Sequence, residues 1–173
     1  MTLETAPRLT FVLGGTRSGK SLFAETIVTR LSPPWHYIAT AQSFDAEMTM
    51  RIAKHRARRG ADWMTRDAPL ELAPALNEIL SGQPVLVDCL TLWLTNTMLA
   101  GRPMETAIDE VAGALAARAG PCVVVSTEVG LGIVPDNALA RAFRDHAGSL
   151  HQRMAALANR VVFMVAGLPV EVK

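Results

Sequence analysis

Short apolar runs of strand length recur along the chain and alternate with longer segments of helical periodicity. The strand-type runs are bounded by glycine, proline or polar residues and fall at 9–13, 35–40, 63–66, 84–88, 121–126 and 161–166. The helical segments fall at 21–30, 45–59, 69–80, 91–100, 104–118 and 137–159. Because strands alternate with helices throughout, the pattern predicts an α/β protein with a mainly parallel sheet and helices on both faces.

The C-terminal part of the pattern adds an amphipathic helix and an edge strand. The helix at 137–159, capped by Asp136 or Asn137, carries one apolar stripe formed by Leu139, Phe143, Ala147, Leu150, Met154 and Leu157. After 161–166, the residues 167–169 can turn a last strand, 170–173, antiparallel onto the sheet edge. No repeat, low-complexity tract or linker interrupts the pattern, so residues 1–173 are expected to form a single domain.

The turn after the first strand carries the strongest chemical signal. It fits the P-loop spacing G-x-x-x-x-G-K-[ST] with Gly14, Gly15, Thr16, Arg17, Ser18, Gly19, Lys20 and Ser21. The glycines let backbone N–H groups surround phosphate oxygens at a helix N-terminus. Lys20 is expected to reach the β- and γ-phosphates, and Ser21 to hold Mg²⁺. We therefore expect an α/β fold of the P-loop NTPase (RecA-like) type.

The alternative for this turn is a glycine-rich loop that binds nothing. Four fixed positions match by accident in roughly one chain of this size in a hundred. The strand before the turn and the helix after it supply the context that a phosphate site requires, and this context favours nucleotide binding.

A second candidate for the phosphate chemistry is Asp88. It ends the apolar run 84–88, as the Walker B acid ends a buried strand and helps to position Mg²⁺ opposite the P-loop hydroxyl. The alternative is a simple strand-end residue. The P-loop elsewhere in the chain favours the metal role.

A basic stretch follows in the second helical segment. Arg51, His55 and Arg59 recur every four residues, so one helix stripe carries an imidazole between two guanidiniums. Cationic neighbours favour the neutral, nucleophilic form of histidine, and the arginines could also bind a triphosphate. The alternative is an ordinary solvated basic helix with a surface histidine.

Composition excludes several classes of protein. Half of the 173 residues are hydrophobic, which argues against disorder, and no apolar run is long enough for a membrane span. The net charge of +1 does not indicate a nucleic-acid-binding protein. Residues 1–8 lack the apolar core of a secretory signal. Cys89 and Cys122 lie in or beside expected buried strands, which suits free thiols and a cytoplasmic location.

With these residues in view, the chain resembles the bifunctional adenosylcobinamide kinase / adenosylcobinamide-phosphate guanylyltransferase family of cobalamin biosynthesis. The matching segments are the P-loop, Tyr37-Ile38-Ala39-Thr40-Ala41-Gln42, Asp45-x-Glu47-Met48 with Arg51-Ile52-x-x-His55-Arg56, Asp88-Cys89-Leu90-Thr91-Leu92-Trp93-Leu94, and Glu128-Val129-Gly130-x-Gly132-Ile133-Val134-Pro135. They span nearly the whole chain. The histidine helix and the last loop are far more specific to the family than the P-loop.

The resemblance implies two reactions. ATP or GTP phosphorylates the aminopropanol hydroxyl of adenosylcobinamide, and GTP then transfers GMP to a histidine, His55 here, and onward to the new phosphate. It implies Lys20 as a further catalytic residue, Mg²⁺ held by Ser21 and Asp88, and a homotrimer. The implied nucleotide contacts are the P-loop residues 14–21 with Ala39, Thr40, Ala41, Arg56, Ala57, Arg58, Arg59, Asp67 and Asp88.

Three positions depart from the family pattern. Thr16 stands where alanine is frequent, and Thr127 and His151 stand where asparagine is common. The last two departures bear on corrinoid binding more than on nucleotide chemistry. Two other functions remain alternatives: a kinase for another small alcohol without a covalent intermediate, and a non-catalytic P-loop module that binds nucleic acid through the basic helix.

Overall fold

The computed structural model describes residues 7–43 and 46–173, and in one helix it leaves the side chains of Glu47 and Arg51 undescribed. Asp45 and the Arg51 side chain, both named above, therefore lie outside the described part. One sheet of seven strands organises the fold, in the order β3-β2-β4-β5-β1-β6-β7. The strands are β1 Leu9–Gly14, β2 Trp35–Ala39, β3 Trp63–Asp67, β4 Val85–Asp88, β5 Cys122–Thr127, β6 Arg160–Val165 and β7 Leu168–Glu171.

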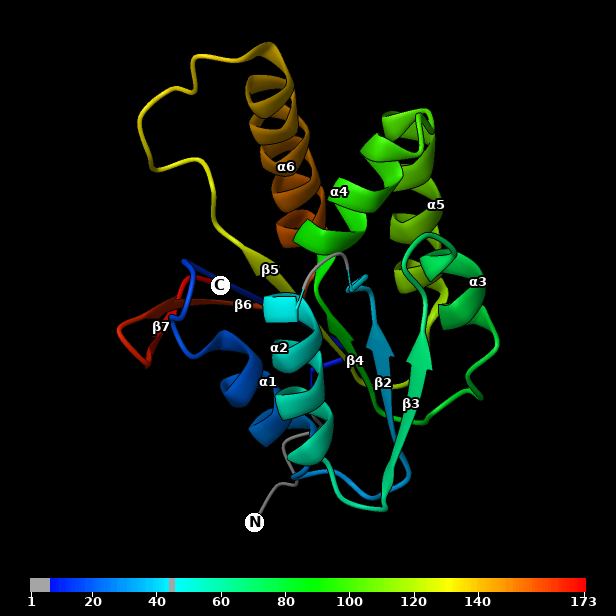
Figure 1. Ribbon diagram of the computed structural model, residues 1–173. Helices are drawn as coiled ribbons and strands as arrows, with labels where there is room; N and C mark the ends of the chain where they lie inside the picture. Colours follow the sequence, from blue (N-terminus) through cyan, green and yellow to red (C-terminus); the bar gives the residue numbers. More distant parts are fainter. Residues whose placement is uncertain (1–6, 44–45) are drawn as a thin grey trace.

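All strand pairs are parallel except β6 with β7. This confirms the mainly parallel sheet and the antiparallel edge strand expected from the sequence. The helices are α1 Lys20–Val28, α2 Ala46–Ala57, α3 Leu72–Asn77, α4 Leu90–Leu99, α5 Met104–Ala117 and α6 Ala138–Leu157. Figure 1 shows the sheet at the centre with helices before and behind it.

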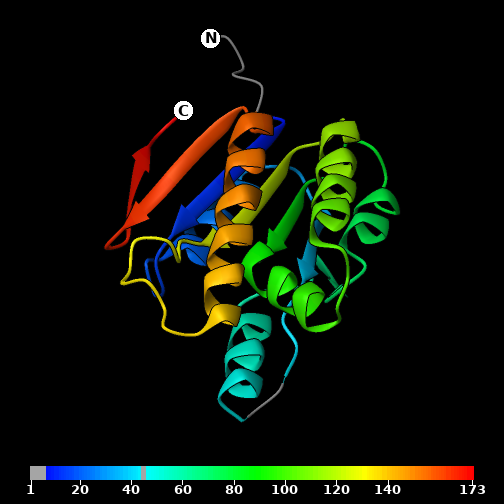
Figure 2. The same cartoon turned by 90° about the horizontal axis from the view of Figure 1, so that it is seen from above.

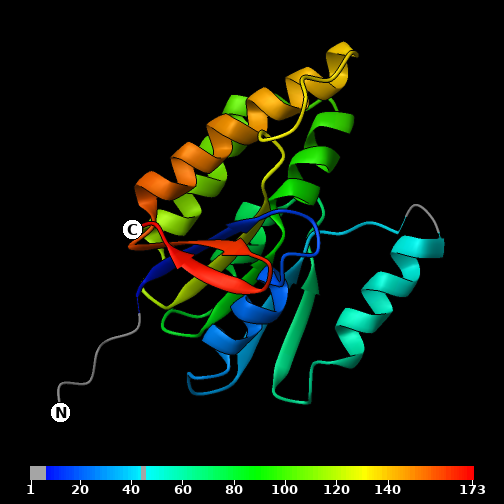
Figure 3. The same cartoon turned by 90° about the vertical axis from the view of Figure 1, so that its left-hand side faces the viewer.

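Two apolar layers lie on the two faces of the sheet. Alternate residues of the strands point to opposite faces, so Phe11 packs with α3 to α6 and Val12 packs with α1. In Figure 2 the helices α3 to α6 cover the near face of the sheet. In Figure 3 helix α1 lies on the other face and α2 stands apart from the sheet. Buried strands flanked on both faces explain why the apolar runs are nearly continuous.

Helix α6 matches the predicted amphipathic stripe with one exception. Its N-cap is Asn137, whose side chain accepts a hydrogen bond from the backbone N–H of Ala140 at 2.8 Å. Ala147, Leu150 and Met154 are buried. Leu139 was expected on the same stripe but is 59% exposed, because the first turn of α6 extends beyond the sheet.

The chain ends in a tighter hairpin than the sequence indicated. Strand β7 begins at Leu168, two residues before the expected position. Ala166 and Gly167 both have positive φ, as a two-residue type I′ turn requires, so the turn is complete before Leu168. Helix α3, at Leu72–Asn77, is likewise shorter than the expected segment 69–80.

The carboxyl ends of the parallel strands meet at one edge of the sheet, where ligands bind in open α/β proteins. Gly14, Ala39, Asp67, Asp88 and Thr127 end five neighbouring strands. Both cysteines, which lie within the described part, are buried free thiols. Burial raises the pKa of Cys89 to about 11 and that of Cys122 to about 12. None of the helices in the described ranges combines the length and apolarity needed to span a membrane.

Candidate active site

A cavity of about 780 Å³ opens at the carboxyl edge of the sheet. The P-loop and α1 form its floor, the ends of β2, β3 and β4 form one side, and α2 forms the outer wall. Ten of the residues expected to contact nucleotide or take part in catalysis line it, namely Thr16, Lys20, Ser21, Ala39, Ala41, His55, Arg56, Arg59, Asp67 and Asp88. The fold thus brings together segments that lie up to about seventy residues apart in the sequence.

The P-loop has the geometry of a phosphate cradle. Gly19 is the N-cap of α1 and has a φ of 90°, a left-handed conformation that favours glycine. Lys20 is buried, and its Nζ donates a hydrogen bond to the carbonyl of Gly15 at 2.8 Å, so the ammonium is held over the loop. The Ser18 Oγ is buried and has no hydrogen-bond partner in the described part of the chain.

Tyr37 supports Asp88, which lines the cavity at the end of β4. The Tyr37 hydroxyl donates to Asp88 Oδ2 at 3.1 Å, and burial raises the pKa of this phenol, so it remains a donor at neutral pH. The sequence reasoning gave Tyr37 no role. Its position two residues before Ala39 on the same strand places both on one face, which is the signal that could have identified it.

Arg59 brings donors to the cavity that suit an anion. Its guanidinium carbon lies 3.6 Å from the centre of the Tyr37 ring, a cation–π contact. Its Nε and Nη1 are buried and have no hydrogen-bond partner among the described residues. Buried guanidinium donors without a partner are costly, and a phosphate oxygen in the cavity would satisfy them.

His55 lies on α2 and lines the same cavity as Lys20 and Ser21. Its Nδ1 is 3.2 Å from a terminal nitrogen of Arg58. A guanidinium only donates, so Nδ1 accepts and carries no proton in this contact. In this contact Arg58 uses the Nδ1 lone pair, so the proton of a neutral ring lies on Nε2, and Nε2 must lose that proton before it can act as a nucleophile.

Two ion pairs join α2 to the body of the protein. Arg56 contacts Asp67 of β3 at 2.8 Å, and Arg58 contacts Glu25 of α1 at 3.3 Å. Glu25 is largely buried, and no sequence pattern indicates its role. Desolvation raises the pKa of Glu25, while the charge of Arg58 opposes that shift. Pairing Arg58 with both Glu25 and His55 connects the histidine to the helix that follows the P-loop.

The remaining expected residues lie around the cavity rather than in its lining. Gly15, Arg17 and Ser18 line a second cavity of about 560 Å³ on the other side of the loop, beside the ends of β6 and of the loop after β5. Thr40 is fully buried, and its hydroxyl bridges the backbone of Cys89, donating to the carbonyl at 2.7 Å. The other expected residues outside the lining are Gly14, Gly19, Ala57 and Arg58.

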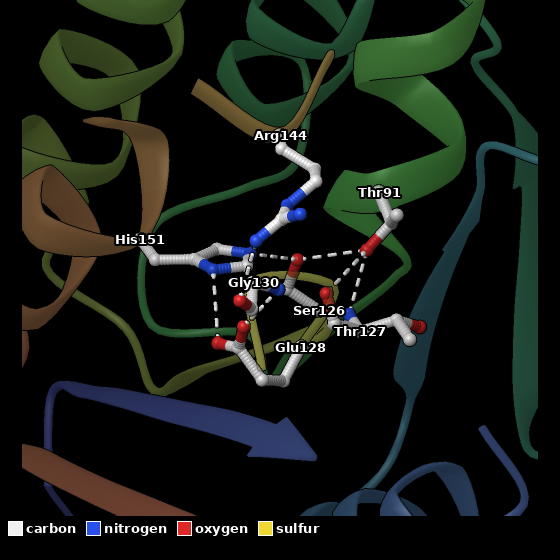
Figure 4. A network of polar contacts seen from close by, with 7 residues as sticks. All are labelled: Thr91, Ser126, Thr127, Glu128, Gly130, Arg144 and His151. Carbon is white, nitrogen blue, oxygen red and sulfur yellow. Dashed lines mark hydrogen bonds and ion pairs between the residues drawn. The ribbon is translucent and has the colours of Figure 1, made fainter. Parts of the chain in front are cut away.

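A polar network stands behind the cavity wall at the end of β5 (Figure 4). His151 of α6 points toward Ser126 and Glu128, with Nε2 2.8 Å from Ser126 Oγ and Nδ1 3.7 Å from a carboxylate oxygen of Glu128. The loop that follows is fixed by Arg144, which donates to the carbonyls of Gly130 and Ile133. The other contacts join Thr91 to Ser126 and Thr127, and the Glu128 carboxylate to the N–H of Gly130.

Comparisons with known proteins agree with this geometry. A family model described as cobinamide kinase / cobinamide phosphate guanyltransferase matches residues 10–172. The bifunctional adenosylcobalamin biosynthesis protein CobP of Pseudomonas aeruginosa is 48% identical over 168 residues, covering 94% of this chain and 95% of that protein. Protein CobU of Salmonella typhimurium, described in the same words, is 39% identical over 178 residues, covering 94% and 98%.

A solved structure supports the fold class. An ATPase from the type III secretion system of pathogenic bacteria superposes with a TM-score of 0.56 at 11% identity, over 95% of this chain and 56% of that one. At this identity the likeness concerns the fold alone, and it confirms the P-loop NTPase architecture. The extent and identity of the sequence matches decide the family. The chain belongs to the cobinamide kinase / cobinamide phosphate guanyltransferase family.

Proposed function

We propose that this protein carries out both reactions of its family at one phosphate-binding loop, and that His55 carries GMP between them. The observation that supports the proposal is that His55, Lys20 and Ser21 line a single cavity, although α2 and the P-loop are separate in sequence. A histidine in the wall of a cavity that also holds a phosphate-binding loop is a candidate nucleophile toward a triphosphate.

In the first reaction the aminopropanol hydroxyl of adenosylcobinamide attacks the γ-phosphorus of ATP or GTP. A new O–P bond forms, the bond to the β-phosphate oxygen breaks, and the hydroxyl proton is released to solvent. Such transfers depend on positioning and charge stabilisation more than on covalent catalysis. Lys20 and Arg59 supply cationic donors at the cavity surface for the phosphate oxygens.

In the second reaction a His55 nitrogen attacks the α-phosphorus of GTP. An N–P bond forms, the bond to the β-phosphate oxygen breaks and pyrophosphate leaves, while the ring proton is released to solvent. The phosphate made in the first reaction then attacks the same phosphorus and breaks the N–P bond, and the ring takes up a proton from solvent, which restores the imidazole. Splitting one transfer into two in this way is the general advantage of covalent catalysis. Because Nδ1 accepts from Arg58, Nε2 is the nitrogen that attacks and the proton that leaves comes from it.

The residues at the cavity fit a magnesium ion. Ser21 offers a hydroxyl and Asp88 a carboxylate, and both line the cavity. The described residues contain no group of three or more His, Cys, Asp or Glu side chains that could hold a metal. This agrees with Mg²⁺, which binds one or two protein oxygens and completes its shell with phosphates and water. When bound, the ion neutralises charge on the phosphates.

The test of the histidine role is a covalent labelling experiment. Incubation with GTP labelled at the α-phosphate is expected to attach label to the protein through an acid-labile, base-stable bond. His55→Asn is expected to abolish the label, because the amide is not a nucleophile. His36→Asn is the matched control, since His36 bonds Gln83 at 2.8 Å away from the cavity and should leave labelling intact.

If the His55→Asn protein still acquires label, His55 is not the carrier. If the wild-type protein phosphorylates adenosylcobinamide but never acquires label, the covalent scheme fails and a plain kinase remains. Mass spectrometry of the labelled protein would identify the modified residue directly.

Two further features belong to the proposal. We place the enzyme in the cytoplasm, supported by the two free thiols, and we infer a homotrimer from the family resemblance. Sedimentation of the purified protein measures the oligomeric state.

A further inference from the structure

The network in Figure 4 connects a buried histidine to the wall of the main cavity. Ser126 is fully buried, and its Oγ lies 2.8 Å from His151 Nε2 and 2.9 Å from Thr91 Oγ1. Thr91 lines the cavity and also accepts a hydrogen bond from the N–H of Thr127 at 2.6 Å. Three side chains thus form one hydrogen-bonded chain that runs from the interior to the cavity.

The positions of the protons along this chain follow from the partners. Burial lowers the pKa of His151, so the ring is neutral at physiological pH. Nδ1 faces the Glu128 carboxylate, which can only accept, so the ring proton belongs on Nδ1. Nε2 must then accept from Ser126, and Ser126 accepts from Thr91. The Thr91 hydroxyl proton therefore points inward.

The charged groups around the ring are few. Glu128, on the loop after β5, is the facing carboxylate. Arg144 lies two turns earlier on α6 and donates to loop carbonyls. From β1 the ring meets Phe11, with the ring centres 5.9 Å apart, and β5 and α4 contribute the hydroxyls of Ser126 and Thr91.

We propose that His151 is a positioning residue that fixes Thr91 as a hydrogen-bond acceptor toward the cavity, and that Thr91 thereby orients the substrate hydroxyl in the kinase reaction. The proposal rests on the proposed function. With its proton directed at Ser126 and one lone pair used by Thr127, Thr91 has one lone pair left for a ligand. An alcohol about to be phosphorylated must turn its oxygen lone pair to phosphorus, and donating its proton to Thr91 orients it so.

Protonation of His151 reverses this polarity. Both ring nitrogens then donate, so Ser126 accepts from Nε2 and gives its own proton to Thr91. Thr91 now accepts from Ser126 and from the N–H of Thr127, which uses both of its lone pairs, and its own proton can go to the carbonyl of Thr127, 3.5 Å away. A substrate hydroxyl then finds no acceptor at Thr91. The guanylyl transfer differs, because its acceptor is a phosphate that needs no hydrogen-bond acceptor.

The experiment measures both activities on one preparation between pH 7.5 and 5.5. In the wild-type protein, kinase kcat is expected to fall more steeply than GMP labelling does as the pH approaches the pKa of His151, which burial lowers from the ordinary 6.5. His151→Gln keeps an amide oxygen that can accept from Ser126, but it cannot titrate. This variant is expected to retain kinase activity at pH 7.5 and to lose less of it at acidic pH than the wild-type protein does.

Ser126→Ala provides a second, independent variant. It interrupts the hydrogen bonds between His151 and Thr91 without introducing a titratable group. Kinase kcat is expected to fall about fivefold at every pH, which is the effect of losing one hydrogen bond. The KM for ATP and the GMP labelling are expected to stay unchanged. Thermal unfolding of each variant excludes loss of fold as the cause.

The proposal is overturned if His151→Gln and wild type share one kinase pH profile, or if Ser126→Ala leaves kinase kcat unchanged. Failure of the proposed function has a different signature, since the wild-type protein would then lack phosphorylation of adenosylcobinamide, GMP labelling, or both.

Discussion

At the scale of single residues, the stack formed by Arg59, Tyr37 and Asp88 determines the chemistry of one cavity wall. Arg59 covers the ring of Tyr37, whose hydroxyl in turn donates to Asp88. A ring between a cation and a carboxylate holds both in place without neutralising either by direct contact. The stack thus presents a cation and an anion to the same cavity, where we propose that nucleotide and Mg²⁺ bind.

Tyr37→Phe tests the contact between Tyr37 and Asp88. It keeps the ring under Arg59 and removes only the donor to Asp88. Because partners of metal ligands orient them, the Mg²⁺ concentration for half-maximal GMP labelling is expected to rise about tenfold. Trp35→Phe is the matched control. Trp35 lies on the same strand as Tyr37, and the substitution removes its hydrogen bond to the carbonyl of Leu31, away from Asp88. An unchanged Mg²⁺ requirement in Tyr37→Phe would separate Tyr37 from the metal site.

The sequence predicts the chemistry-bearing residues more readily than their supports. The P-loop and Asp88 are predicted from spacing and context and His55 from the family resemblance, and all three segments meet at one cavity. The roles of Tyr37 and Glu25 did not follow, because each depends on a partner brought near by strand order and helix placement. Apolar periodicity shows that a strand is buried but does not show which strands are its neighbours.

At the scale of elements, the turn between β1 and α1 is held by close backbone packing. A Cβ placed on Gly14 would lie 2.7 Å from Ser18 Oγ and 2.8 Å from the carbonyl oxygen of Met164, and the latter is backbone that cannot move aside. The same addition at Gly15 meets nothing within 4 Å. Close packing therefore excludes a side chain at Gly14, whereas the space around Gly15 would accept one.

Gly14→Ala is expected to destabilise the fold by about 2 kcal/mol, the typical cost of overpacking, and to lower Tm by roughly 5 °C. Gly15→Ala is expected to change the free energy of unfolding by less than about 0.5 kcal/mol. Thermal and urea unfolding of the two variants measure this difference. Equal stabilities would contradict the close contact between the P-loop and β6.

Element boundaries show where sequence patterns lose precision. The strands and helices were placed in the right order, and the antiparallel edge strand was anticipated. The position of β7 was off by two residues because the positive φ of Ala166 was not foreseeable for a residue with a side chain. Leu139 matched the helical stripe, but periodicity carries no information about how far a helix extends past the sheet.

At the scale of the whole molecule, the buried histidine should make stability depend on pH. The unfolded chain binds a proton at His151 near pH 6.5, whereas burial lowers the pKa of the folded ring. Below pH 6.5 the unfolded chain therefore binds more protons, and acidification favours unfolding until the folded pKa is passed. The neutral ring contributes its full stabilisation only above that range.

The expected result is a smaller free energy of unfolding at pH 5.5 than at pH 7.5, with a smaller loss in His151→Gln. Urea denaturation at the two pH values measures the change in the free energy of unfolding for each protein. The difference between these two changes removes the contribution of the remaining histidines. A pH dependence that is identical in the two proteins would show that His151 does not titrate differently on folding.

The place of β1 in the sheet has a consequence for synthesis. This strand carries the P-loop, yet its two neighbours are β5 and β6, which are encoded more than a hundred residues later. The turn before β7 also reaches back, since the N–H of Gly167 donates to the carbonyl of Ser18. During synthesis, β1 cannot complete its pairing until β5 and β6 have emerged from the ribosome. The loop after β1 therefore stays without its folded surroundings while more than a hundred further residues are added.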